Sequence, residues 1–413
     1  MFSLALIIYV KSKTAELYIS DPLIFGYATF VTMFQLSRVI AAFFHKKTNE
    51  EIVKNKSSTK KAYEPDVSFV IPCKNEQESI AKTVDKCFAA NYPKNKLEVI
   101  VINDGSTDNT GTILNKCRQI YGNHLIVVHW AQNRGKRHGM AEGFRLAKGE
   151  VIIQLDSDSY IVPETLPKMV QFFENPEIGA VCAHADPENA DKNLLTKMQA
   201  AYYFVSFRIL KAAESAFASV FCCSGCSSAY RRDIVMPILD EWLEEKFFGL
   251  PVTWGDDRAL TNRVLKGGFR TVYTYEVRAY TIVPEKLKIF LKQQVRWKKG
   301  WFVNSIFASK FIYYRDPFVA FTYFYPLILV TLLTPFMALR ALIINPIRGV
   351  SPFYYIAGVI LVAVIIVLYY RFLSRENKYW PYVFVWSGIN MILLSFVLFY
   401  ALATIQNRKW GTR

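Results

Sequence analysis

Histidine is scarce in this 413-residue sequence, and neither the histidines nor the cysteines form a recognisable metal-binding motif. The five histidines show no HExxH pattern and no Cys/His spacing of the zinc-binding kind. The seven cysteines are odd in number and none lies in an apolar span, which argues against a disulfide framework and indicates a reducing compartment. We find no internal repeat and no low-complexity tract. These absences exclude a small secreted scaffold and argue against a zinc protein.

Acidic residues are also few, with 34 Asp and Glu against 50 Lys and Arg, so the formal net charge is +16. This charge favours anionic partners such as phosphate-bearing substrates, anionic lipid head groups or nucleic acid, and it does not choose among them. Hydrophobic residues make up 52% of the chain and aromatic residues 15%, which is too apolar for an ordinary soluble protein. We therefore expect a protein that resides in a membrane.

Three apolar stretches are long enough to cross a bilayer as helices, at residues 22–44, 318–339 and 351–370. Residues 1–10 are too short to cross and lack the features of a removable signal peptide, so we interpret them as an interfacial or truncated helix. A basic run that begins at Lys46 follows the first stretch. By the positive-inside rule, it places the following domain in the cytoplasm.

A fourth apolar stretch, residues 379–405, is interrupted by Pro381, Gly388 and Asn390. A full crossing by this stretch would place the basic C-terminal tail on the outer face, against the positive-inside rule. Non-helical backbone is tolerated at membrane depth where protein buries it or where it lines a cavity. We therefore predict that this stretch breaks, returns to the cytoplasmic side and packs against the basic helix described next.

Between the first span and residue 283, short apolar strands alternate with amphipathic, helix-like segments. The strands are VSFVIP, LEVIVIN, LIVVHW, VIIQLD and IGAVCA, and their alternation predicts a βαβ series with a mainly parallel sheet. The segment that follows is basic and amphipathic, which predicts helices lying at the membrane interface. The expected domains are an N-terminal membrane segment, a cytoplasmic α/β domain, interfacial helices, and C-terminal transmembrane and re-entrant segments, at residues 1–46, 47–283, 284–316 and 317–413.

Acidic residues occur where predicted strands end or helices begin, and ligands of parallel sheets bind at such ends. Asp104 in VINDGSTDNT could accept a hydrogen bond from a ligand base edge, or merely belong to a capping turn. Asp156 and Asp158 in LDSDS could face one divalent cation that holds a diphosphate, although such pairs are frequent by chance. Asp256 and Asp257 in GDDR begin a predicted helix, where capping is the alternative. QQVRW lies on the predicted interfacial helix. It could be part of a site, or merely belong to a basic surface that faces lipid.

Taken in order, the motifs resemble those of the processive, membrane-integrated family 2 glycosyltransferases: IPCKNE, NDGSTDNT, RGKRHGM, DSDS, CSGCSSAYRR, GDDR and QxxRW. GKRH, NLLTKM, GDDRALTN, QQVRW and the terminal WGTR are most similar to the hyaluronan synthases within that family. The stretch from Cys222 to Cys226 resembles the chitin-oligosaccharide synthases equally. The resemblance implies a GT-A type domain fused to membrane helices. It also implies a β-linked, GlcNAc-containing polymer that is made with inversion and exported.

The resemblance also implies a role for each motif. Asp158 and Asp156 would hold Mg²⁺ or Mn²⁺, and Asp257 would be the general base. The other residues implied in catalysis are Asp256, Arg296 and Trp297. Those implied in UDP binding are Glu76, Asp104, Lys136, Arg137, Asp156, Gln293, Arg296 and Trp297. Those implied in acceptor binding are Cys223, Ser224, Gly225, Cys226 and Trp297.

The implied partners are UDP-GlcNAc and UDP-GlcUA, the growing polysaccharide and the lipid bilayer, with no nucleic acid. The expected protein is a monomeric, multi-pass enzyme of the plasma membrane with its catalytic domain in the cytoplasm. A chitin or chitin-oligosaccharide synthase using UDP-GlcNAc alone remains the main alternative. A dolichyl-phosphate sugar transferase would need neither QxxRW nor WGTR. A nucleic-acid-binding membrane protein would leave DSDS and GDDR unexplained, and a pseudoenzyme would have lost carboxylates that are present here.

Overall fold

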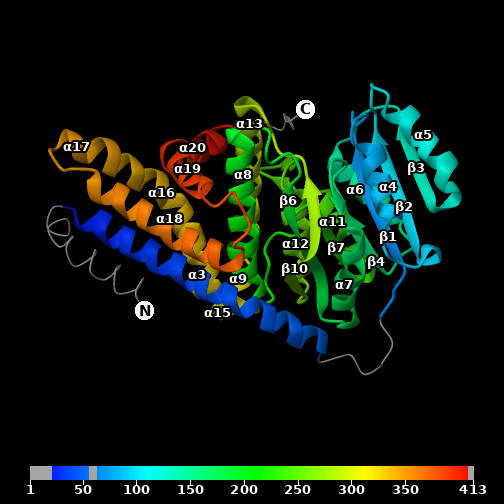
Figure 1. Cartoon of the computed structure of the whole chain (residues 1–413), viewed down its shortest axis with the longest axis horizontal. Helices are drawn as coiled ribbons and strands as arrows, with labels where there is room; N and C mark the ends of the chain where they lie inside the picture. Colours follow the sequence, from blue (N-terminus) through cyan, green and yellow to red (C-terminus); the bar gives the residue numbers. More distant parts are fainter. Residues whose placement is uncertain (1–20, 55–62, 408–413) are drawn as a thin grey trace.

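The structure, a computed structural model, describes residues 21–54 and 63–407. An α/β domain that contains the main sheet lies beside a bundle of long helices, and helices α8 (Leu194–Val205) and α13 (Leu287–Ser309) stand between them (Figure 1). The long helix α3 (Pro22–Lys54) runs from the far end of the bundle toward the α/β domain (Figure 1). The predicted helix at 1–10 and the terminal WGTR motif lie outside the described residues.

The main sheet has eight strands in the order β3-β2-β1-β4-β7-β6-β10-β5. Its neighbours are parallel except where β7 pairs with β4 and β6, and where β5 pairs with β10. The mainly parallel sheet predicted from the sequence is confirmed. The strands are β1 (Val67–Cys73), β2 (Leu97–Asp104), β3 (Leu125–Trp130), β4 (Val151–Gln154), β5 (Tyr160–Ile161), β6 (Ile178–Pro187), β7 (Ser228–Arg231) and β10 (Arg270–Thr281).

Side chains of the central strands alternate between two hydrophobic cores, one on each face of the sheet. Val70 and Ile100 belong to one core, whereas Phe69 and Val99 belong to the other. All seven residues of β1 are buried, as expected for a parallel strand covered on both faces. Helix α6 (Lys136–Leu146) packs closely over β1, because a Cβ at Gly143 would overlap Val70. This packing holds the N-terminus of α6 at the carboxyl end of the sheet.

Four helical runs among the described residues are long and apolar enough to cross a membrane: Pro22–Val53, Pro317–Ile347, Tyr355–Leu373 and Tyr382–Ala403. The first corresponds to α3. The second contains α16 (Tyr325–Leu339), and the third lies within α18 (Phe353–Leu373). These helices confirm that the three predicted spans are helical. The fourth run corresponds to the stretch that we expected to break.

The fourth run is helical throughout, so the predicted break is wrong. Helix α19 (Tyr382–Ile389) continues through a π-helical segment, η9 (Asn390–Leu394), into α20 (Ser395–Ala403). The Ser395 hydroxyl donates to the carbonyls of Asn390 and Met391, which keeps backbone polar groups satisfied in the widened turn. A single turn of π-helix therefore joins α19 to α20 without ending the helix.

Both ends of this run contact the catalytic part of the chain. Before α19, Lys378 forms an ion pair with Asp191 at 2.7 Å. After α20, Lys299 of α13 donates to the carbonyls of Thr404 at 2.5 Å and Asn407 at 3.0 Å. The expected packing against the helix that carries QxxRW is therefore present, since α20 lies along α13. That both ends lie on the cytoplasmic side stays a prediction.

Candidate active site

A cavity of about 1330 Å³ begins at the carboxyl ends of the parallel strands and continues among the membrane helices. Asp104, Asp158 and Asp257 line its first part, whereas Thr334 and Asn390 line the part within the helical bundle. Every predicted site residue except Cys223 contributes to its wall. Cys223 is fully buried in the core, and the neighbouring Cys222 lines the cavity instead. The predicted acceptor contact of Cys223 is therefore wrong.

Asp104, at the end of β2, orders the loop that leads into α6. Its Oδ1 accepts a hydrogen bond from the backbone N–H of Arg134 at 2.6 Å, and its Oδ2 accepts one from Gly135 at 2.9 Å. Glu76 accepts from the Ser79 hydroxyl at 2.7 Å. Both carboxylates line the cavity and both order loops at its wall. Their contact with uridine stays a prediction.

Lys136 and Asp156 form an ion pair at the place where the diphosphate is expected. Lys136 is the first residue of α6, so its positive charge adds to the partial positive charge at the helix N-terminus. Asp156 also accepts from the Gln154 amide at 3.4 Å, and Gln154 in turn donates to the Gly225 carbonyl at 3.0 Å. This arrangement connects the predicted diphosphate site with the predicted acceptor loop.

Asp156 and Asp158 have the chemistry of a divalent-cation site. Burial, together with the nearby charge of Asp156, raises the pKa of Asp158 to about 6. Two carboxylates that disfavour each other's charge are stabilised by a hard divalent cation. No group of three or more His, Cys, Asp and Glu in the described chain could hold a metal ion. The pair therefore fits a cation such as Mg²⁺ or Mn²⁺ that takes further ligands from a substrate diphosphate.

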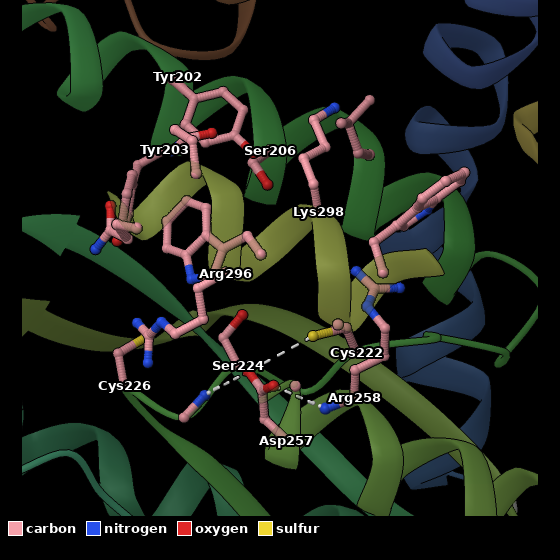
Figure 2. A pocket seen from close by; sticks show the side chains of 18 of the residues that line it. Tyr202, Tyr203, Ser206, Cys222, Ser224, Cys226, Asp257, Arg258, Arg296 and Lys298 are labelled. Carbon is pink, nitrogen blue, oxygen red and sulfur yellow. Dashed lines mark hydrogen bonds between the residues drawn. The ribbon is translucent and has the colours of Figure 1, made fainter. Parts of the chain in front are cut away.

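Asp257 lies in the first turn of α12 (Asp256–Lys266), between the acceptor loop and α13. Its Oδ2 accepts from the Gly225 N–H at 3.2 Å and lies 3.6 Å from the Cys222 thiol, and its Oδ1 accepts from the Arg258 N–H at 2.8 Å (Figure 2). Gly255, which precedes the helix, has φ +76°, and a Cβ there would lie 2.9 Å from Gly300 Cα of α13. Only glycine permits this close approach, which places Asp257 beside the helix that carries QxxRW.

Gln293, Arg296 and Trp297 line the same cavity from α13. Burial lowers the pKa of Arg296, while the charges of Asp156, Asp256 and Asp257 act in the opposite direction. The Arg296 guanidinium thus lines the cavity within reach of the charges of Asp156, Asp256 and Asp257. Such a charge can stabilise a leaving diphosphate.

Arg137 and Asp256 pair with each other beneath the site. The Arg137 Nε donates to Asp256 at 2.8 Å, and a second nitrogen donates to Glu245 at 2.9 Å and to the Trp242 carbonyl at 3.0 Å. Both members of the pair are about 95% buried. Arg137 was expected to bind UDP, and Asp256 was expected to act in catalysis. Both residues also line the cavity, so these roles stay predictions, and the ion pair in addition joins α6 to α12.

We expect Arg137→Gln to lower the free energy of unfolding by about 3–5 kcal/mol, because it removes the ion-pair partner of the buried Asp256 and leaves Glu245 with Arg263 alone, at 3.5 Å. Arg145→Gln is the matched control on the same helix, since Arg145 pairs with Asp240, whose side chain is 82% exposed. That change should stay within about 1 kcal/mol. Denaturant unfolding in detergent measures both, and equal losses would contradict this role of the ion pair in joining the two helices.

Comparisons with known proteins agree with this site. Residues 68–239 match the family model described as glycosyl transferase family 2. The chain is 33% identical to a hyaluronan synthase of Streptococcus pyogenes serotype M1 over 86% of this chain and 84% of that protein. The chain belongs to glycosyltransferase family 2. It is also 28% identical to an N-acetylglucosaminyltransferase of Azorhizobium caulinodans, over 84% of this chain and 87% of that protein.

The fold of this family 2 glycosyltransferase is also found among solved structures. A mannosyltransferase, PcManGT from Pyrobaculum calidifontis, solved in complex with GDP-Man and Mn²⁺, matches with a TM-score of 0.61 at 20% identity. The match covers 93% of this chain and 99% of that chain. The GT-A fold, the membrane helices and the assignment as a hexosyltransferase are thus confirmed.

Several cavity residues of this family 2 glycosyltransferase were not predicted from its motifs. Figure 2 shows Tyr202 and Tyr203 of α8 at one side of the pocket, with Cys222, Ser224 and Asp257 at the other. Tyr202 also stacks on Trp386 of α19, with ring centroids 3.9 Å apart. The sequence feature that could have identified such residues is a polar side chain within an apolar segment. The residues of this kind that line the cavity are Tyr27, Thr32, Gln35, Arg38, Thr334 and Asn390.

Proposed function

We propose that the protein synthesises hyaluronan processively from UDP-GlcNAc and UDP-GlcUA and passes the growing polysaccharide into the membrane. The observation that carries this proposal is the cavity, which continues from Asp158 and Asp257 to polar residues of the membrane helices. A sugar chain extended at Asp257 therefore has a path directly into the bundle. The similarity to a hyaluronan synthase over most of both chains supports the choice of product.

The proposed reaction is a direct displacement at the anomeric carbon of the donor sugar. Asp257 removes the proton from an acceptor hydroxyl, whose oxygen attacks the anomeric carbon on the face opposite the UDP. The bond to the UDP oxygen breaks and UDP departs with the electron pair, so an α-linked donor gives a β-linked product. Lys136 and Arg296 stabilise the charge that develops on the diphosphate. Asp156 and Asp158 would hold Mg²⁺ or Mn²⁺, which neutralises the same charge.

The proposed location is the plasma membrane, with several crossings and the catalytic domain in the cytoplasm. All seven cysteines are free, which fits a reducing compartment. The long apolar helices fit a lipid bilayer. The proposed enzyme acts as a monomer. We propose no nucleic-acid partner.

A chitin-like product from UDP-GlcNAc alone is the second candidate. The similarity to an N-acetylglucosaminyltransferase favours it, as does the Cys222–Cys226 stretch of the acceptor loop. Both products share the same chemistry at Asp257, so the two candidates differ only in the donor and acceptor sugars that the cavity accepts.

Incubation of the purified protein with UDP-GlcNAc alone, and then with added UDP-GlcUA, separates the two candidates. We expect polymer longer than a few sugars only when both donors are present, and we expect hyaluronidase to degrade it. Gel filtration of radiolabelled product measures this directly. Long polymer from UDP-GlcNAc alone, degraded by chitinase, would establish the alternative.

A further inference from the structure

We propose that the thiol of Cys222 is a positioning group for the proposed base, because it holds one oxygen of the Asp257 carboxylate and leaves the other for the acceptor. The inference rests on the proposed function and deepens it. Cys222 Sγ donates to Asp257 Oδ2 at 3.6 Å, a contact that Figure 2 shows as a dashed line. Both residues line the cavity. The contact joins the acceptor loop to the first turn of α12.

The Cys222 thiol is a hydrogen-bond donor at neutral pH. Burial and the nearby charge of Asp257 raise the pKa of Cys222 to about 12, so the thiol keeps its proton. A thiol nucleophile would instead need a lowered pKa. The geometry and the protonation state therefore agree on a neutral donor that faces the carboxylate.

The hydrogen bonds of Asp257 distinguish its two oxygens. An ionised carboxylate oxygen has two lone pairs that accept hydrogen bonds. Oδ2 accepts from the Gly225 N–H at 3.2 Å and from the Cys222 thiol, so both of its lone pairs are engaged. Oδ1 accepts only from the Arg258 N–H, among the residues that the structure describes. Oδ1 is therefore the oxygen that takes the proton of the acceptor hydroxyl.

The backbone around Cys222 is fixed, which holds the thiol in place. The Lys211 ammonium donates to the Cys222 carbonyl. The Cys223 N–H donates to the Thr261 hydroxyl at 3.0 Å, and this hydroxyl donates to the Asp257 carbonyl at 2.7 Å. Lys211 and Thr261 are both more than 90% buried. The loop residue that carries the thiol and the helical turn that carries the base are thus tied to each other.

The test compares Cys222→Ala with Cys222→Ser in initial-rate measurements at saturating donor over a range of pH. In Cys222→Ala the ionised base loses a donor, so the acidic limb of the kcat profile should move to higher pH by about 0.5–1 unit. At neutral pH, kcat should fall about three- to tenfold, because the carboxylate is free to turn. Cys222→Ser keeps a donor at the same place and should stay close to the wild type.

Cys117→Ala is the matched control, because Cys117 is a buried thiol of α5 (Thr110–Tyr121) that lies outside the cavity. It should leave the acidic limb unchanged. Binding of UDP by each variant reports whether the donor site is intact.

Three results would overturn the inference. The first is a wild-type limb and kcat in Cys222→Ala, and the second is a Cys222→Ser variant that behaves like Cys222→Ala. The third is a raised KM for an acceptor oligosaccharide with an unchanged limb, which would make Cys222 a contact of the acceptor sugar. In each case, polymer that requires both donors would still uphold the proposed function. Long polymer from UDP-GlcNAc alone would overturn the proposed product, and a shifted limb would still uphold the role of Cys222, since both products need the same base.

Discussion

Asp257→Asn is expected to lower kcat by about 10²–10⁴-fold while the variant still binds UDP together with Mg²⁺ or Mn²⁺. An amide cannot remove the proton of the acceptor hydroxyl. Its single amide oxygen can still accept one of the two backbone N–H groups, of Gly225 and Arg258, that bind separate oxygens of Asp257. Initial rates with both donors and calorimetric titration with UDP measure the two effects separately.

Asp240→Asn is the control for this change, because Asp240 is exposed and lies outside the cavity. It should leave both the rate and UDP binding unchanged. If Asp257→Asn weakened UDP binding and kept normal turnover at saturating donor, Asp257 would belong to the donor site and would not be the base.

Asp158→Asn is expected to abolish turnover, with a loss on the order of 10³-fold or more, because a metal ion contributes several kcal/mol of transition-state stabilisation. EDTA should have the same effect on the wild type, and added Mn²⁺ should reverse it. The fold should survive. Burial and the charge of Asp156 raise the pKa of Asp158 above its usual value, so the ionised group destabilises the metal-free protein at neutral pH. The asparagine variant should therefore unfold at the same denaturant concentration or a higher one.

Turnover and unfolding have to be measured on the same preparations of Asp158→Asn. Inactive protein with wild-type stability supports a role in holding the cation. Full activity of the wild type in EDTA would refute the metal requirement.

The central sheet could be predicted because its parallel strands are continuous apolar runs. β1, β2, β4 and β6 are each buried along most of their length, so hydrophobicity alone identifies them. The edge strand β3 is apolar in sequence although only Leu125 is buried. β7 has only four residues and ends in arginine, and β10 begins with an exposed arginine and alternates exposed and buried positions in its second half. Neither has the appearance of a buried parallel strand. They enter the sheet through long-range pairing that no local pattern encodes.

The site was predictable to the level of motifs and not to the level of individual side chains. Successive residues at a helix start point in different directions, so GDDR does not reveal that Asp256 turns to Arg137 while Asp257 faces the acceptor loop. The sequence likewise does not reveal that Cys222 lines the cavity while the next residue, Cys223, is buried in the core. The sequence also did not reveal that the helix continues through Asn390, whose carbonyl accepts a hydrogen bond from the Ser395 hydroxyl five residues later.

The division of the reaction between Asp158 and Asp257 is tested most directly by a structure of the protein with UDP and Mn²⁺, in which anomalous scattering locates the ion. We expect the Mn²⁺ peak beside Asp158 and Asp156, in contact with the diphosphate, and we expect Asp257 to face open space on the acceptor side. A Mn²⁺ peak at Asp256 and Asp257, with the diphosphate bound there, would contradict this assignment.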